Sequence, residues 1–213
     1  MSEVPARASR VGLAVELVVL YVLIPAVFLI EDGRLERAIV IVAGLTYVIV
    51  QSLRKRILRR TSLGTGGFLQ WKRVLALFGM FAIASTLAVA LVAPQLLFRA
   101  PRSHPRLWVT FLAVYCLLSV YPQALVFRAY FLERYARLFT DPWLLVGVNS
   151  VLFAWAHTII AHPLVYALSF CGGVLFAVTY LESRSVTVTS IEHALYGVWL
   201  FTVGLGTYFA FPI

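Results

Sequence analysis

The chain contains apolar runs that are long enough to cross a lipid bilayer as helices. The first covers residues 11–30 and reads VGLAVELVVLYVLIPAVFLI, and about 20 apolar residues in a helix span the hydrocarbon core. Hydrophobic residues make up 62% of the 213 residues and charged residues only 13%. A soluble domain of this composition would expose a very large apolar surface, so the sequence predicts an integral membrane protein.

We expect an all-α fold, a polytopic transmembrane helical bundle with about seven spans. The apolar runs lack the alternation of strands, which favours helices over a barrel. One integral membrane domain is predicted over residues 1–213, with N-terminal spans in 11–98 and a second set in 107–209. The expected spans are residues 11–30, 38–53, 74–98, 107–130, 143–161, 163–181 and 187–209.

Basic residues are concentrated between the second and third runs. Seven of the eighteen Lys and Arg residues fall in 54–73, a segment without Asp or Glu. Loops rich in Lys and Arg stay in the cytoplasm, so this charge is a topology signal and not a nucleic-acid site. We therefore expect a lipid-embedded protein of a prokaryotic cytoplasmic membrane, with its N-terminus in the cytoplasm, its C-terminus outside and no nucleic-acid partner.

The fourth run contains an arginine and an amide, Arg128 and Gln123. An arginine inside the bilayer costs about 2.5 kcal/mol or more and requires an internal partner, unless its side chain reaches the interface. A carboxylate one turn away, at position 124, would be the natural partner, but the residue is Ala124. Gln123 can form a hydrogen bond, in the site or between helices, but cannot act as a general base.

In the fifth run, Asn149, Phe153 and His157 follow at four-residue steps and so share one stripe of a helix. A membrane histidine is either a packed core residue or part of a functional site. We favour a functional role for His157, because position 124 is expected to lie level with it on the neighbouring helix.

A helix start is predicted at residues 140–142 (Thr-Asp-Pro), because Asp and Thr suit the cap and Pro the first position. We expect the fourth and fifth helices to form an antiparallel hairpin about this turn. Both helices rise by the same distance per residue, so positions equally far from the turn lie at the same height. Position 124 then faces His157, and Arg128 faces Phe153.

The seventh run contributes the polar residues Ser190, Glu192, His193 and Tyr196, with Gly197 one turn after His193. Counting residues along the hairpins does not bring His193 to the height of His157. The glycine pair at 172–173 leaves room for a kink between them.

Three further residues lie inside apolar runs: Glu16, Cys116 and Cys171. Glu16 either pairs with a buried arginine or sits near the interface. The cysteines have no paired spacing, which argues against a disulfide framework, and we interpret them as small core residues.

Several intramembrane chemistries do not fit this sequence. It has no His-Glu-x-x-His, no Gly-x-Ser-x-Gly and no pair of membrane aspartates. Two histidines without a convincing third ligand do not make a zinc site, so we expect neither a metal nor another cofactor. The one chemistry of this group that still fits the residues is the activation of water by a carboxylate and histidines.

Three segments together resemble the CPBP family (CAAX protease and bacteriocin-processing, also called Abi) of intramembrane proteases. Residues 123–128 (QALVFR) are similar to its Glu-Glu-x-x-x-Arg motif, 153–157 (FAWAH) to Phe-x-x-x-His, and 192–197 (EHALYG) to a His-x-x-x-Asn-like motif. The resemblance covers about residues 107–200 and implies that the second set of spans is the catalytic core.

The resemblance also implies roles for individual residues. In this family the glutamate and the first histidine activate water, and the second histidine with the small polar residue one turn later stabilises the oxyanion. His157 would then assist the base, His193 would bind the oxyanion and Arg128 would hold the carboxylate ionised. The predicted substrate-binding residues are Phe153, Asn149, Tyr196 and Gly197.

Two departures from the family pattern bear on activity. Gln123 and Ala124 stand where the motif has paired glutamates, and Gly197 stands where it has Asn. Ala124 is either an introduced inactivating change or the mark of a natural pseudoenzyme.

The predicted function is an intramembrane endopeptidase, inactive as written, whose substrate is a lipidated or membrane-anchored protein or peptide. The alternative is a non-catalytic membrane pseudoprotease or adaptor that binds a peptide or a partner helix. A small transporter with Arg128, Glu16 and Glu192 on a solute path is disfavoured, because no inverted repeat is visible.

Overall fold

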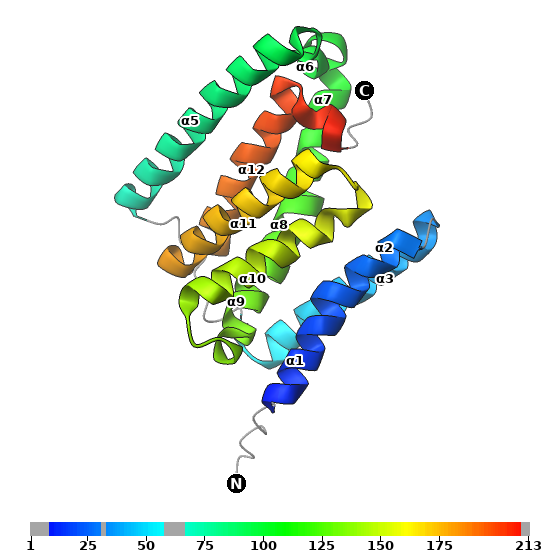
Figure 1. Cartoon of the computed structure of the whole chain (residues 1–213), viewed down its shortest axis with the longest axis vertical. Coiled ribbons are helices and arrows are strands. Elements are labelled where there is room, and N and C mark those ends of the chain that lie inside the picture. The colour runs from blue at the N-terminus through cyan, green and yellow to red at the C-terminus, as the bar shows by residue number, and fades with distance from the viewer. Residues whose placement is uncertain (1–8, 31–32, 58–66, 210–213) are drawn as a thin grey trace.

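The computed structural model describes residues 9–30, 33–57 and 67–209, and within these ranges every regular element is a helix (Figure 1). This confirms the predicted all-α polytopic bundle. Six helical stretches are long and apolar enough to cross a membrane: Arg10–Ile30, Arg34–Arg54, Gln70–Val92, Pro105–Arg134, Pro142–Ile159 and Pro163–Ser183. They correspond to the first six predicted spans.

The first two spans form a hairpin, drawn in blue in Figure 1. α1 (Arg10–Val18) and α2 (Ile24–Ile30) are joined by a π-helical turn at Val19–Leu23, and α3 (Arg34–Arg54) packs beside α2. Pro25 has no N–H to donate to the preceding turn. The helix therefore widens just before it instead of continuing with regular α-helical hydrogen bonds.

The third span lies closer to the N-terminus than the predicted 74–98. α5 covers Phe68–Val92, and the chain then turns at Pro94, which cannot continue helical hydrogen bonding. The short helix α6 (Arg99–Ser103) leads to the fourth span. Residues 58–66 of the predicted basic loop lie outside the described residues, and its cytoplasmic side remains a prediction.

The fourth span is one continuous helical path that widens twice into π-helix. Its α-helical parts are α7 (Pro105–Val114), α8 (Tyr121–Gln123) and α9 (Phe131–Arg134). The π segments, Tyr115–Val120 and Ala124–Tyr130, lie on either side of α8, where a proline removes a backbone donor. The second π segment carries position 124 and the arginine, and π turns are frequent at functional sites.

α10 (Pro142–Trp155) and α11 (Pro163–Ser183) form the next hairpin. Asp141 Oδ1 accepts a hydrogen bond from the N–H two residues later at 2.8 Å, which confirms the predicted cap. α11 runs uninterrupted through its two glycines. At Gly173 a Cβ would lie 2.9 Å from the Cα of Ser150, so the glycine permits the close approach of the two helices.

The seventh helix, α12 (Val186–Val203), lies between α5 and α11 and also packs on the fourth span (Figure 1). It matches the predicted seventh span but ends earlier than residue 209, because Gly204 takes a left-handed conformation with φ 119°. A short 3-10 turn, Leu205–Phe209, follows. α12 is thus the inner helix of the C-terminal half.

Glu16 connects the first helix to the end of the fourth span. Its carboxylate accepts hydrogen bonds from Arg134 Nε and Nη2 at 3.1 and 2.8 Å and from the hydroxyls of Tyr130 and Tyr135 at 2.6 and 3.0 Å. Burial raises the pKa of Tyr135 well above its usual range, so this hydroxyl stays protonated and donates. Of the two sequence-based alternatives, the structure selects pairing with an arginine.

The two cysteines differ in their surroundings. Cys116 is half-buried, whereas Cys171 is exposed in the middle of α11. The prediction that both are core residues is therefore wrong for Cys171, because the hydrophobicity of a span does not tell a core face from a lipid-facing one.

Candidate active site

Arg128 is buried inside the bundle, with 2% of its surface exposed. Its Nη1 donates to the Asn149 side-chain oxygen and, at 3.5 Å, to the Phe127 carbonyl. The guanidinium lies over the Phe153 ring, 4.6 Å from its centroid, and 5.7 Å from that of Phe176. The side chain does not reach the interface, and the predicted matching heights of Arg128 and Phe153 are confirmed.

Asn149 holds the fourth span and α10 together at this point. It is fully buried, its amide nitrogen donates to the Phe127 carbonyl at 2.8 Å, and its oxygen accepts from Arg128. Both ends of the amide are thus engaged within the helix pair. The structure makes Asn149 a support for the guanidinium, while substrate binding by this residue remains a prediction.

Both histidines contact the same aromatic ring. The Phe153 centroid lies 5.0 Å from the His157 ring, 5.7 Å from the His193 ring and 5.1 Å from the Phe127 ring. The imidazoles, from α10 and α12, are therefore separated by no more than two ring-to-ring spacings. The fourth span, α10 and α12 together place one guanidinium and two imidazoles around Phe153.

His157 sits where α10 tightens into the 3-10 turn Ala156–Ile159. Its Nδ1 lies 2.8 Å from the Phe153 carbonyl oxygen. A carbonyl only accepts, so Nδ1 carries the proton and Nε2 keeps a free lone pair. This tautomer suits a proton acceptor.

His193 is fixed by aromatic rings on α11 and on the fourth span. It stacks on Phe176 at 4.6 Å with an interplanar angle of 24°, and it meets Tyr115 edge-on at 6.3 Å. A Cβ at Gly197, one turn later, would overlap the Tyr115 hydroxyl. Tyr115 therefore occupies the volume that a side chain at 197 would need.

The helices that build this arrangement also match a known family. Residues 105–199 match the family model described as type II CAAX prenyl endopeptidase Rce1-like. The match supports the assignment of this part of the chain to the CPBP family. The CPBP family is a family of CAAX-type intramembrane proteases, which fits the spans described above. No curated protein and no solved structure matches the chain.

Ala124, which the motif resemblance aligns with the family's glutamate, is 3% exposed and belongs to the same buried cluster as Phe127 and Phe153. Gln123 turns back along its own helix, where its amide nitrogen donates to Ser119 Oγ at 2.7 Å. Among the described residues, Arg128 makes no hydrogen bond to a carboxylate. The catalytic role assigned to Gln123 stays a prediction and has no contact that supports it.

The third CPBP motif carries two residues with contacts that the sequence did not reveal. Tyr196 packs its ring on Phe78 and Phe81 of α5, at 5.6 and 5.2 Å, and its hydroxyl has no partner among the described residues. Gly197 faces Tyr115 of the fourth span. Substrate binding by Tyr196 and Gly197 remains a prediction.

Glu192 is a polar residue of the seventh run in the sequence, but it was not among the predicted site residues. This carboxylate is 0% exposed, and neither oxygen has a hydrogen-bond partner in the part of the chain that the structure describes. It lies within range of the charges of Arg73 and Arg128. The signal was present, because an intramembrane acidic residue next to His193 is a functional candidate by its position alone.

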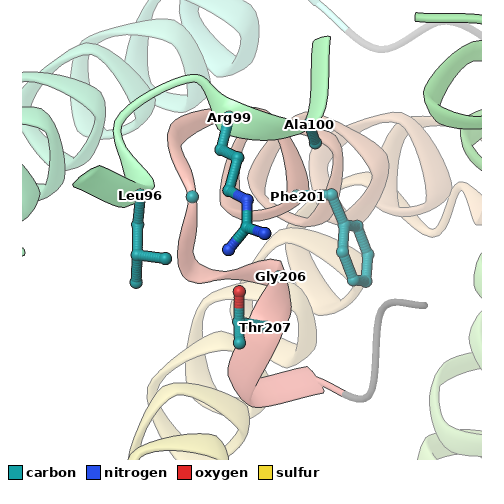
Figure 2. A pocket seen from close by; sticks show the side chains of 7 residues that line it. Leu96, Arg99, Ala100, Phe201, Gly206 and Thr207 are labelled. Carbon is teal, nitrogen blue, oxygen red and sulfur yellow. The ribbon is translucent and has the colours of Figure 1, made fainter. Parts of the chain in front are cut away.

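The described residues contain no cluster of three or more His, Cys, Asp or Glu side chains suited to a metal; the absence of a metal or other cofactor remains a prediction. A small cavity of about 10 Å³, the size of one water, lies between α6 and the C-terminal turn, where Arg99 points toward Thr207 (Figure 2). Its lining residues come from 96–100, from the C-terminal end of α12 and from the turn that follows, and they include none of the predicted site residues.

Proposed function

We propose that this chain is a CPBP intramembrane endopeptidase for a membrane-associated protein or peptide, and that it is inactive as written because position 124 is alanine. One observation carries the proposal. Arg128, His157 and His193, from three helices, surround Phe153, and Ala124 is buried in the cluster that contains this ring.

The arrangement suits hydrolysis once a carboxylate stands at position 124. That carboxylate, beside the Arg128 guanidinium, would take a proton from water, with His157 Nε2 as a second acceptor. The resulting hydroxide adds to the peptide carbonyl, and His193 donates to the developing oxyanion. The proton then passes to the leaving amine as the C–N bond breaks. Without the carboxylate, the remaining groups bind but do not activate water.

The proposed substrate is a lipidated or membrane-anchored protein or peptide. Arg128 and His157 lie within candidate membrane spans, and His193 lies on α12, which packs among these spans, so a scissile bond must enter the bundle from the membrane or its surface. A lipid group or an apolar anchor raises the local concentration of such a bond at the bilayer.

Restoring the carboxylate tests the proposal. Ala124→Glu, reconstituted in vesicles, should cleave a membrane-tethered reporter peptide from a panel with prenylated and unlipidated C-termini. Ala124→Gln, which has the same shape without the charge, should stay inactive, and His193→Ala should abolish the gained activity. If Ala124→Glu cleaves no peptide of the panel but crosslinks to one, the chain is a non-catalytic binder and the protease proposal is overturned.

A further inference from the structure

A line of polar groups extends from one end of the bundle to the buried Glu192. At its outer end Arg73 of α5 pairs with Glu182 of α11, Nη2 to Oε2 at 3.1 Å, and both side chains are partly exposed. Together with Gly67 and Gln70 they line a surface depression of about 370 Å³. This depression opens beside the first turns of α5, next to the predicted basic loop.

Thr179 forms the next step inward. It is fully buried, its hydroxyl accepts from Arg73 Nη2 at 2.6 Å, and its carbonyl accepts from the Gln70 amide at 3.2 Å. Its hydroxyl also lies beside Glu192 without reaching hydrogen-bonding geometry. The Arg73 side chain thus connects the surface to a polar group inside the bundle.

Glu192 forms the inner end. It lies six residues after Val186 in α12, or about 9 Å along the axis, and His193 follows it directly. One turn along the same face, the Tyr196 hydroxyl also lacks a partner, as does Ser190 Oγ in the preceding turn. Three residues along about two turns of α12 therefore present buried polar atoms without hydrogen-bond partners among the described residues.

An unpaired buried carboxylate has a large desolvation penalty, and within a membrane it is maintained only by pairing or by contact with water. Glu192 lies within range of the charges of Arg73 and Arg128 but forms a hydrogen bond to neither. We infer that Glu192 is the inner end of a polar access route by which water reaches the Arg128 and His193 site from the Arg73–Glu182 surface. The route opens on the membrane face that carries the basic loop.

Cysteine accessibility tests the route without any catalytic readout, so its failure is distinct from failure of the protease proposal. Thr179→Cys, in a Cys116→Ala background, is treated with a membrane-impermeant cationic methanethiosulfonate on either side of sealed vesicles. The native Cys171, exposed mid-span on the same helix, is the internal control. Thiolates form in water, so Cys171 in lipid should react slowly.

We expect Thr179→Cys to react at least tenfold faster than Cys171, and only from the face of the basic loop. Glu192→Cys, in the same background, is a second reporter if Thr179→Cys does not fold, and it should show the same sidedness. Reaction at the Cys171 rate from both faces would overturn the route. Fast reaction from the opposite face alone would overturn it as well.

Discussion

Two carboxylates in apolar helices of this protein, the half-buried Glu16 and the buried Glu192, have opposite surroundings. Glu16 accepts four hydrogen bonds, two from Arg134 and two from tyrosine hydroxyls. Glu192 is more deeply buried and has no hydrogen-bond partner among the described residues. A fully paired polar network holds helices in one arrangement, whereas an unpaired buried charge persists where a function requires it. We therefore interpret the first carboxylate as structural, and we assign the second to the proposed site.

The largest effect is expected from removal of the structural carboxylate. Glu16→Ala leaves Arg134 without its partner, and we expect a loss of about 2 to 3 kcal/mol in unfolding free energy. Unfolding in mixed detergent micelles measures this loss. Glu16→Gln keeps part of the hydrogen bonding and should lose less. A loss of less than about 1 kcal/mol for Glu16→Ala would show that the hydrogen bonds of Glu16 do not stabilise the fold.

A smaller effect should follow from crowding the site region. Gly197→Ala pushes a methyl group into Tyr115, and overpacking of this kind destabilises by about 1 to 3 kcal/mol. Tyr115→Leu removes the ring that the methyl meets, so the double variant should recover part of the loss. A double-mutant cycle by micelle unfolding measures the coupling; additive losses would contradict close packing between Tyr115 and Gly197.

The smallest effect on stability is expected at Glu192. Glu192→Gln has nearly the same shape and loses no hydrogen bond, so the unfolding free energy should change by less than about 1 kcal/mol. This contrasts with Glu16→Gln under the same conditions. If Glu192→Gln destabilised the protein more than Glu16→Gln, Glu192 would be a structural counter-charge. The assignment of a structural role to Glu16 and a site role to Glu192 would then be wrong.

Local pattern was enough to predict much of the chain. Apolar run length predicted the spans, and the Asp141 cap followed from residue preferences at helix starts. The common rise of two adjacent helices brought Arg128 level with Phe153. These features depend on neighbours in sequence or on one short hairpin, so a single sequence contains the information.

Contacts between distant helices were decided only by the tertiary structure. Counting along the hairpins did not bring His193 to the height of His157, yet both rings meet Phe153. Tyr115 is one aromatic among many in an apolar run, and only packing brings its hydroxyl against Gly197.

The sequence by itself determined that this protein is a helical membrane bundle with an arginine, two histidines and no carboxylate at position 124. Only the tertiary structure decided which carboxylate is paired and which is isolated. Glu16 and Glu192 are both acidic residues in apolar runs, and their difference arises from the side chains that other helices bring to them. The energy of a buried charge depends on those neighbours and not on its own segment.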